Sequence, residues 1–418
     1  MQTAASRPAH EILGQPLTLP SGLILPNRLA KAAMSEALGT ADNRVTHALE
    51  QLYARWSEGG AGLLITGNVM VDRRALGEPG NIVLEDDRDR ESLRRWASAG
   101  TRQGNQLWMQ LNHPGKQAPQ GLNRETVAPS AVPFVPALQR FFATPRALEN
   151  AEIEDIIQRF GTAARLAKEA GFTGIQIHGA HGYLVGQFLS PHHNVREDQW
   201  GGSPENRRRF VLRVLASIRD AVGRQFPVGI KLNSADFQKG GFGEAESIDT
   251  FKALAAAGID MIEISGGTYE APAMTGIRAK ESTRQREAYF LEFAEKARAA
   301  VDTPLMLTGG FRTAEGMAAA INSGAIDLVG LARLLAIEPD APNRLLAGHA
   351  TYHHVRPIRT GIKAVDRMAL MEITWYTRQL RRMGKGRNPK PTESGFKSFL
   401  IGLLENGWGT FKTKRMRA

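Results

Sequence analysis

Two histidines and a tyrosine lie close together in the segment IHGAHGY, residues 177 to 183. They are His178, His181 and Tyr183, and a basic residue, Lys231, follows later in the chain. Histidine and tyrosine side chains transfer protons and stabilise developing negative charge, and histidine also binds metal ions. A single histidine at a strand end is usually structural, but this pair with Tyr183 and Lys231 favours a catalytic site.

Two glycine-containing segments could bind a phosphate group. The first reads TGGFR, residues 308 to 312, and the second reads GLAR, residues 330 to 333. Glycines let backbone N–H groups approach phosphate oxygens, and an arginine adds a charged donor. Both segments follow strands that we expect to be the seventh and eighth of a barrel, where phosphate groups commonly bind.

Short apolar segments typical of strands recur along the chain, and segments with helical periodicity lie between them. We expect eight strands, at Leu29–Met34, Gly62–Val71, Gln106–Asn112, Thr173–His178, Val228–Asn233, Asp260–Ser265, Pro304–Leu307 and Asp327–Leu331. We expect helices at Glu152–Ala170, Pro204–Val222, Ser247–Ala257, Arg286–Ala300 and Thr313–Ser323, each ending near a glycine. Eight successive βα units with right-handed crossovers predict an α/β fold of the closed (β/α)8, or TIM barrel, type.

Polar and apolar residues alternate in the central strands. Gln110, Gln176, His178, Lys231 and Ser265 all lie on the faces opposite the apolar ones. With a period of two, the apolar faces pack against the helices and the polar faces line the barrel axis. Buried polar groups cost free energy unless they are paired, so we expect a polar ligand to pair them.

Three segments lie outside the eight βα units. The segment LTLPSGLIL, residues 17 to 25, predicts a hairpin that covers the bottom of the barrel. The proline-rich residues 114 to 150 predict a loop on the substrate side. We expect residues 1–350 to form the barrel domain and residues 351–418 to form a helical extension, which packs on the barrel or a partner subunit rather than forming an active-site wall.

Composition limits the possible chemistry. The 418 residues include no cysteine, which excludes disulfides, thiolate nucleophiles and iron–sulfur clusters, so any redox reaction needs a cofactor. The net charge of +11 lies mostly in residues 376–418, which hold eleven Lys or Arg against two Glu. No apolar segment is long enough to span a membrane, and the N-terminal residues lack a signal-peptide core, so we expect a cytoplasmic location.

A longer segment gives a specific resemblance. Residues 177 to 210 read IHGAHGYLVGQFLSPHHNVREDQWGGSPENRRRF, which is similar to the H-x-x-H-G-Y and F-L-S-P-x-x-N-x-R-x-D-x-x-G-G-S segments of the Old Yellow Enzyme family. The similarity extends from about Leu17 to about Pro339 and includes the segments PNRLAKAAMS, GLLITGNVMV, QLWMQLNHPGKQ and LTGGF. The resemblance implies a TIM-barrel oxidoreductase that binds FMN and takes hydride from NADH or NADPH.

The resemblance also implies which residues would contact FMN. The Ser35 hydroxyl would bond the flavin C4 carbonyl, Gln110 would contact the pyrimidine edge, and Lys231 would face N1 and the C2 carbonyl. The other residues at positions that contact the cofactor are Ala33, Met34, Asn68, Gly309, Gly310, Ala332 and Arg333, of which the last four match the phosphate site. Some relatives carry cysteine at position 35 and tyrosine at position 37, where this chain has Ser35 and Ala37.

The implied catalytic residues are His178, His181 and Tyr183. The two histidines would bind the oxygen of an α,β-unsaturated carbonyl or nitro substrate, an enone or enal for example. Hydride would reach the β-carbon from the flavin, and Tyr183 would protonate the α-carbon. The expected partners are this small substrate and further copies of the chain in a homo-oligomer, with no membrane partner.

Two other functions remain as alternatives. A metal-dependent hydrolase on the same barrel would use His178, His181, His192, His193 and an aspartate, but the first strand lacks the metal-ligand histidines that such hydrolases have. We therefore expect no metal site. A nucleic-acid binder would use the basic tail and show a steep dependence on salt, and the sequence does not favour it.

Overall fold

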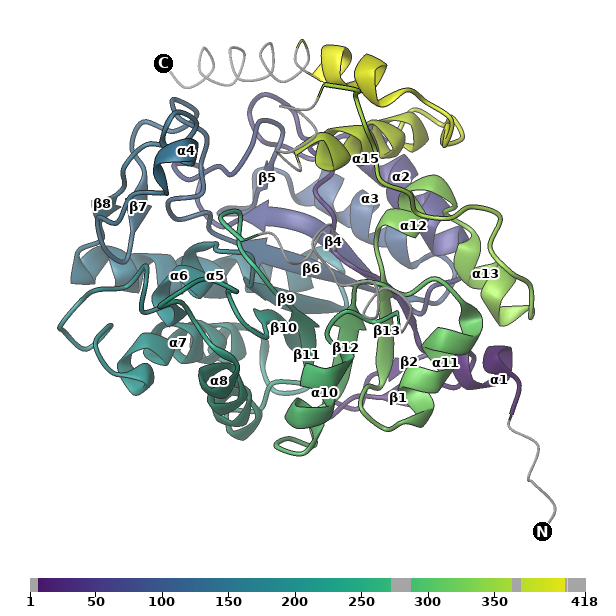
Figure 1. Ribbon diagram of the computed structural model, residues 1–418, viewed down its shortest axis with the longest axis horizontal. Helices are drawn as coiled ribbons and strands as arrows, with labels where there is room; N and C mark the ends of the chain where they lie inside the picture. The colour runs from purple at the N-terminus through teal and green to yellow at the C-terminus, as the bar shows by residue number, and fades with distance from the viewer. Residues whose placement is uncertain (1–6, 272–286, 363–369, 403, 405–418) are drawn as a thin grey trace.

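Eight parallel strands close into a barrel, with helices around the outside (Figure 1). The structure is a computed structural model that describes residues 7–271, 287–362, 370–402 and 404. The barrel strands are β3 (Leu29–Lys31), β4 (Leu63–Met70), β6 (Gln106–Asn112), β9 (Gly174–Gly179), β10 (Val228–Asn233), β11 (Met261–Ser265), β12 (Leu305–Thr308) and β13 (Leu328–Leu331). They pair in chain order, and β13 pairs with β3 to close the ring. The predicted TIM barrel is confirmed, although the first strand ends three residues earlier than expected.

Helices follow the barrel strands. Their bounds are α2 (His47–Glu58), α3 (Arg90–Thr101), α5 (Asn150–Ala170), α7 (Pro204–Val222), α8 (Glu244–Ala256), α10 (Leu291–Arg298) and α11 (Ala314–Asn322). Five of them, α5, α7, α8, α10 and α11, lie where the periodicity predicts them. Helix α7 has the predicted bounds, because the Ser203 hydroxyl accepts the Asn206 N–H and Pro204 occupies the first turn. Helix α10 begins at Leu291, and residue 286 of the expected range lies outside the described residues.

The bottom of the barrel is closed by an apolar plug. Strands β1 (Leu17–Thr18) and β2 (Ile24–Leu25) form the expected hairpin. Its residues pack with inward-facing side chains from the barrel strands, namely Ala30, Leu63, Ile65, Trp108, Met261, Met306 and Leu328. Trp108 fills the axis between two glycines, since a Cβ at Gly174 would lie 2.4 Å from its Nε1 and one at Gly229 would lie 2.7 Å from its Cζ3. Any ligand therefore enters from the opposite end.

Further short elements complete the fold. They are α1 (Ala9–Leu13), β5 (Ile82–Val83), β7 (Val127–Ala128), α4 (Pro136–Gln139), β8 (Arg146–Ala147), α6 (Leu184–Leu189), α12 (Arg333–Ile337) and α13 (Ala341–Leu346). The loop of residues 114 to 150 contains β7, α4 and β8, and it lies beside the open end (Figure 1).

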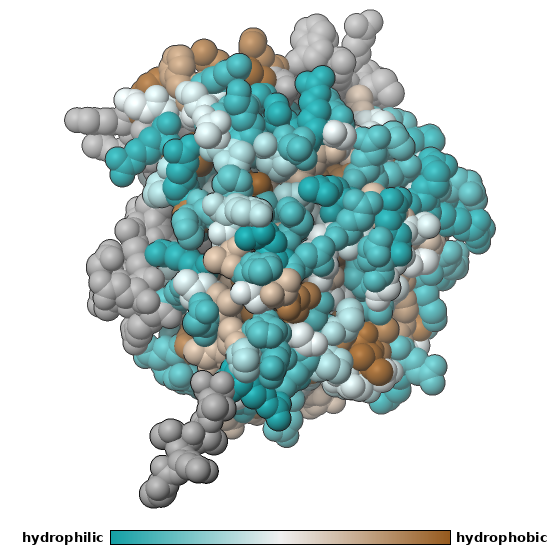
Figure 2. All heavy atoms as spheres, turned by 90° about the vertical axis from the view of Figure 1, so that its right-hand side faces the viewer, coloured by the Kyte–Doolittle hydropathy of each residue, from teal (hydrophilic) through white to brown (hydrophobic). Residues whose placement is uncertain are grey.

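The C-terminal extension packs on the barrel, as expected. Helix α15 (Leu370–Met383) contacts α2 and α12. Figure 2 shows a largely hydrophilic face with hydrophobic side chains gathered at the top of the view, where Figure 1 places the C-terminal segment. Phe396, Leu400 and Leu404 are exposed apolar residues of this segment. None of the described helices is long and apolar enough to cross a membrane.

Candidate active site

A layer of hydrogen-bonded polar side chains crosses the barrel above the plug. Gln110 Nε2 donates to Gln176 Oε1, and Gln176 Nε2 donates to Glu263 Oε2, both at 2.7 Å. Glu263 Oε1 accepts from Lys231 Nζ at 2.8 Å and from Thr308 Oγ1 at 2.7 Å. The predicted inward faces are thus confirmed. The inference that a ligand must pair these groups is wrong for this layer, because the strands pair them with one another.

Strand β9 and the turn after it bring the predicted catalytic residues together. The rings of His178 and His181 lie 5.3 Å apart, and those of His178 and Tyr183 lie 4.7 Å apart, between centroids. His181 has a φ of 61°, a left-handed conformation that turns its side chain toward the axis although its strand parity differs. Asn233 Oδ1 holds this turn by accepting the His181 N–H at 3.2 Å.

Both imidazoles are neutral near pH 7. Burial, followed by the charge of Lys231, holds the pKa of His178 and of His181 well below the usual value for histidine. The Nδ1 atom of His178 accepts the Ala180 N–H at 3.3 Å, so the ring carries its proton on Nε2 and can donate it to a ligand. His181 Nε2 lies 2.7 Å from Ser265 Oγ, which leaves Nδ1 as its second polar atom.

Tyr183 is a protonated phenol with a second tyrosine beside it. Burial, then the neighbouring Tyr269, raises the pKa of Tyr183 well above its usual value. The two hydroxyl groups are 3.2 Å apart. Tyr269 was not predicted from the sequence, because it comes from the loop after β11, 86 residues from Tyr183, and no local pattern marks it.

Comparison with known proteins identifies the family. The model of the NADH:flavin oxidoreductase / NADH oxidase family matches residues 13–351. The NADH-dependent flavin oxidoreductase iliE of Hypocrea jecorina is 39% identical over 360 residues, which cover 80% of this chain and 88% of the relative. The NADH-dependent flavin oxidoreductase iccE of Talaromyces variabilis is 37% identical over 410 residues, covering 89% and 98%. The solved structure of the old yellow enzyme homologue from Zymomonas mobilis superposes with a TM-score of 0.70 at 25% identity, covering 83% and 94%.

The chain belongs to the Old Yellow Enzyme family. It is therefore an NAD(P)H-dependent flavin oxidoreductase, and the resemblance seen in the sequence is confirmed. The family match also implies FMN as the cofactor and a nicotinamide as the reductant.

The expected cofactor residues of this Old Yellow Enzyme family member lie around the open end. Ala33, Met34 and Ser35 follow β3 directly, whereas Asn68 lies in β4, paired in register with Gln110 of β6. Lys231 of β10 lies in register between His178 and Glu263, its ammonium group pairs with the carboxylate, and its charge acts on both histidines.

The predicted phosphate-binding residues lie in the loops after β12 and β13. Gly309 and Gly310 have φ values of 119° and 97°, and a Cβ at Gly310 would lie 2.9 Å from the backbone nitrogen of Ala288. Only glycine fits this position without strain. Ala332 and Arg333 begin α12, and one guanidinium nitrogen of Arg333 is paired with Glu372 of α15 at 2.8 Å.

The C-terminal extension lies closer to the site than expected. Besides the Glu372 pair with Arg333, Thr377 Oγ1 of α15 donates to the backbone oxygen of Ser35 at 3.4 Å. Two residues expected to contact FMN are therefore held by this helix. The extension was expected to pack on the barrel or a partner subunit rather than to form an active-site wall. Helix α15 does pack on the barrel, but it also contacts Ser35 and Arg333 beside the open end.

A second residue that was not predicted from the sequence is Glu78, in the loop between β4 and β5. The Ser35 hydroxyl donates to Glu78 Oε1. This contact spans 43 residues of sequence, and the segment around Glu78 has no motif that would have identified it.

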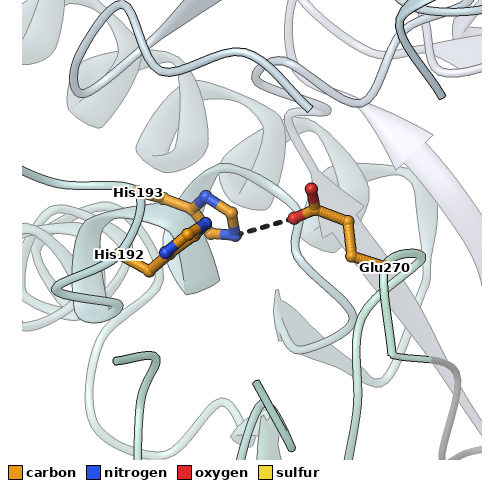
Figure 3. A group of neighbouring side chains, drawn as sticks. All are labelled: His192, His193 and Glu270. Atoms are coloured by element: carbon orange, nitrogen blue, oxygen red, sulfur yellow. Dashed lines mark ion pairs between the residues drawn. The ribbon is translucent and has the colours of Figure 1, made fainter. Parts of the chain in front are cut away.

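The histidines of the hydrolase alternative fall into two separate groups. His192 and His193 lie beside Glu270, with ligand atoms within 4.8 Å of one another (Figure 3). This cluster includes neither His178 nor His181, and no other cluster of its kind occurs among the described residues. The four-histidine site required by that alternative is therefore not formed.

The carboxylate of this cluster already joins three loops. Glu270 Oε1 accepts the Val135 N–H at 2.8 Å, and Oε2 accepts from Gln238 Nε2 at 3.0 Å and lies 3.6 Å from His193 Nε2. The arrangement explains how the loop of residues 114 to 150 is fastened beside the open end.

Proposed function

We propose that the enzyme binds FMN at the open end of the barrel, takes hydride from NADH or NADPH, and reduces the C=C bond of α,β-unsaturated carbonyl or nitro compounds. The observation that carries the proposal is the position of two neutral imidazoles and a protonated phenol beside a buried ammonium group. The two imidazoles and the phenol have the protonation states that the reaction needs.

The donor set at the open end is compatible with FMN. Asn112 faces the axis at the end of β6, is fully buried, and has neither amide atom hydrogen-bonded within the described residues. A buried amide without a partner is costly, so a ligand with both donors and acceptors, as a flavin pyrimidine has, would satisfy it. The buried Lys231 ammonium adds a positive charge that could stabilise a reduced flavin.

Bound FMN supplies a hydride acceptor for the nicotinamide and a hydride donor for the substrate. His178 would donate its Nε2–H to the substrate oxygen, and His181 would add a second donor from Nδ1. These bonds strengthen as the oxygen gains negative charge, and losing one such donor typically costs about 3 kcal/mol of transition-state stabilisation. Tyr183 would transfer its phenolic proton to the α-carbon while the β-carbon receives hydride, so the product gains one hydride and one proton.

The experiment measures the visible absorption of the purified protein after reconstitution with FMN. We expect NADH to bleach the flavin band without oxygen and 2-cyclohexenone to restore it. The double variant His178→Ala/His181→Ala should keep FMN but lose enone binding. The matched control His192→Ala removes a histidine outside this group and should keep both. Failure to bind FMN, or unchanged enone binding in the double variant, would refute the proposal.

A further inference from the structure

Glu78 is held inside the open end by its own loop. Asn81 Oδ1 accepts the backbone N–H groups of Gly77 and Glu78, at 3.0 and 2.8 Å, and Asn81 Nδ2 lies 3.4 Å from Glu78 Oε1. With the loop fixed in this way, the carboxyl group points at the Ser35 hydroxyl and accepts its hydrogen. The family pattern gives a role to Ser35 but none to Glu78.

Charged and titratable groups act on Glu78 from four other segments. Glu36, after β3, repels its negative charge, and Arg381 of α15 attracts it. The charge of Glu78 in turn raises the pKa of Tyr183 and of Tyr269. Glu78 therefore shares the electrostatic environment of the expected proton donor.

Burial, followed by repulsion from Glu36, raises the pKa of Glu78 to about 7. The proton on this carboxyl group therefore exchanges near neutral pH, which an ordinary glutamate does not do. An ionised carboxylate can only accept hydrogen bonds, whereas a protonated carboxyl group can also donate one. The hydrogen bond between Glu78 and Ser35 can therefore change direction when Glu78 gains or loses its proton.

We propose that Glu78 is a positioning residue that decides, by losing or gaining a proton, whether Ser35 gives its hydroxyl hydrogen to Glu78 or to the flavin. The proposal rests on the proposed binding of FMN beside Ser35. With Glu78 ionised, the carboxylate takes the Ser35 hydrogen. With Glu78 protonated, its O–H donates to Ser35 Oγ, and the Ser35 hydrogen becomes free for the flavin C4 carbonyl. One proton enters from or returns to solvent, and no other bond changes.

The consequence concerns the reduction potential of the bound flavin. A hydrogen bond to the C4 carbonyl stabilises the ring more after it has gained electrons, because the oxygen is then more negative. The flavin is thus easier to reduce when Glu78 is protonated. One net hydrogen bond corresponds to roughly a fivefold change in the ratio of reduced to oxidised flavin at a fixed applied potential.

The experiment titrates the reduced-to-oxidised ratio of the bound FMN against pH in a spectroelectrochemical cell. The wild type should show an additional step of roughly fivefold, centred near the value of about 7 given above for Glu78. Glu78→Gln and Ser35→Ala should each abolish this step, and the two together should do no more than either alone. Glu125→Gln, which changes an exposed glutamate paired with Arg146, is the matched control and should keep the step. A step that survives in Glu78→Gln would overturn the proposal, since a merely structural role for Glu78 predicts no change in the pH dependence.

A second measurement separates this inference from the proposed function. The carboxyl carbon of Glu78 is followed by NMR in the protein without FMN, in the wild type and in Ser35→Ala. We expect titration near pH 7 and a higher midpoint in Ser35→Ala, because the carboxylate loses a donor. Titration at the ordinary value for glutamate, or no change in Ser35→Ala, would refute the inference. Absence of FMN binding alone would refute only the proposed function.

Discussion

The buried pair between Lys231 and Glu263 allows a quantitative test of the polar layer. The Nζ–Oε1 distance is 2.8 Å, and the side chains are 5% and 0% exposed. Gln176 and Thr308 donate two further hydrogen bonds to the same carboxylate. We consider the variants Lys231→Met and Glu263→Gln, separately and together, because each keeps the approximate side-chain volume while removing one charge.

Each single variant should be strongly destabilised. Removing one partner of a buried ion pair costs about 3–5 kcal/mol, because the other charge stays buried without compensation. Lys231→Met should lie near the lower end, at about 3 kcal/mol, since two neutral donors still bind Glu263. Glu263→Gln leaves an ammonium facing a neutral amide and should cost about 4 kcal/mol. The double variant holds no unpaired charge, so its cost should be only about 2 kcal/mol, with a coupling energy of several kcal/mol.

The assay is urea unfolding of the FMN-free protein, followed by tryptophan fluorescence. The matched control is the exposed pair between Arg213 and Glu154, also 2.8 Å apart but 48% and 40% exposed, changed in the same way. Its variants should each cost less than about 1 kcal/mol. The reasoning is refuted if the Lys231 and Glu263 variants cost no more than the control variants, or if the double variant costs as much as the two single ones combined.

Four further predictions concern the site and the extension. Tyr183→Phe should lower the rate of enone reduction by about 10² to 10⁴ while leaving flavin reduction by NADH unchanged, and stopped-flow absorbance separates the two half-reactions. The raised pKa of Glu78 means that the folded state binds the Glu78 proton more tightly than the unfolded state does. The stabilisation of the folded state by this proton is fully present below pH 4.5 and is lost as pH rises through about 7. The wild type should therefore lose about 1–3 kcal/mol relative to Glu78→Gln across this window, measured by urea unfolding at several pH values, and parallel curves would contradict it. Trp375→Ala should loosen α15, because Trp375 is 1% exposed and donates to the Glu393 carbonyl, at a cost of about 3–5 kcal/mol and with faster proteolysis of the extension. Removing residues 405–418 should leave FMN content unchanged, and a large loss of FMN would argue that the tail takes part in binding.

The barrel could be predicted from the sequence because its signals are local. Strand β10 has its predicted bounds because apolar Ile230 and Leu232 alternate with inward-facing Lys231 and Asn233 over a short run. Helix α7 has its predicted bounds because the capping serine, the proline after it and the glycine at its end are adjacent to it in sequence.

Contacts between distant loops could not be predicted in the same way. Glu78 meets Ser35, and Tyr269 meets Tyr183, through side chains that follow no periodic pattern. The alternation in β11 places Glu263 opposite apolar Ile262 and Ile264, but its partners could not be deduced without the register of the neighbouring strands. The approach of α15 to Ser35 depends on packing between elements more than 300 residues apart, since Thr377 and Ser35 are separated by 342 positions.

The indole of Trp108 limits which parts of the substrate site can be enlarged by mutation. Wedged between Gly174 and Gly229, it makes the floor rigid, and larger side chains at either glycine would collide with it. A bulkier substrate cannot be accommodated by hollowing out the interior. Changes in specificity must then come from the rim, where Glu270 ties the loop of residues 114 to 150 to its neighbours. Exchanging that loop should alter substrate choice without disturbing the apolar plug.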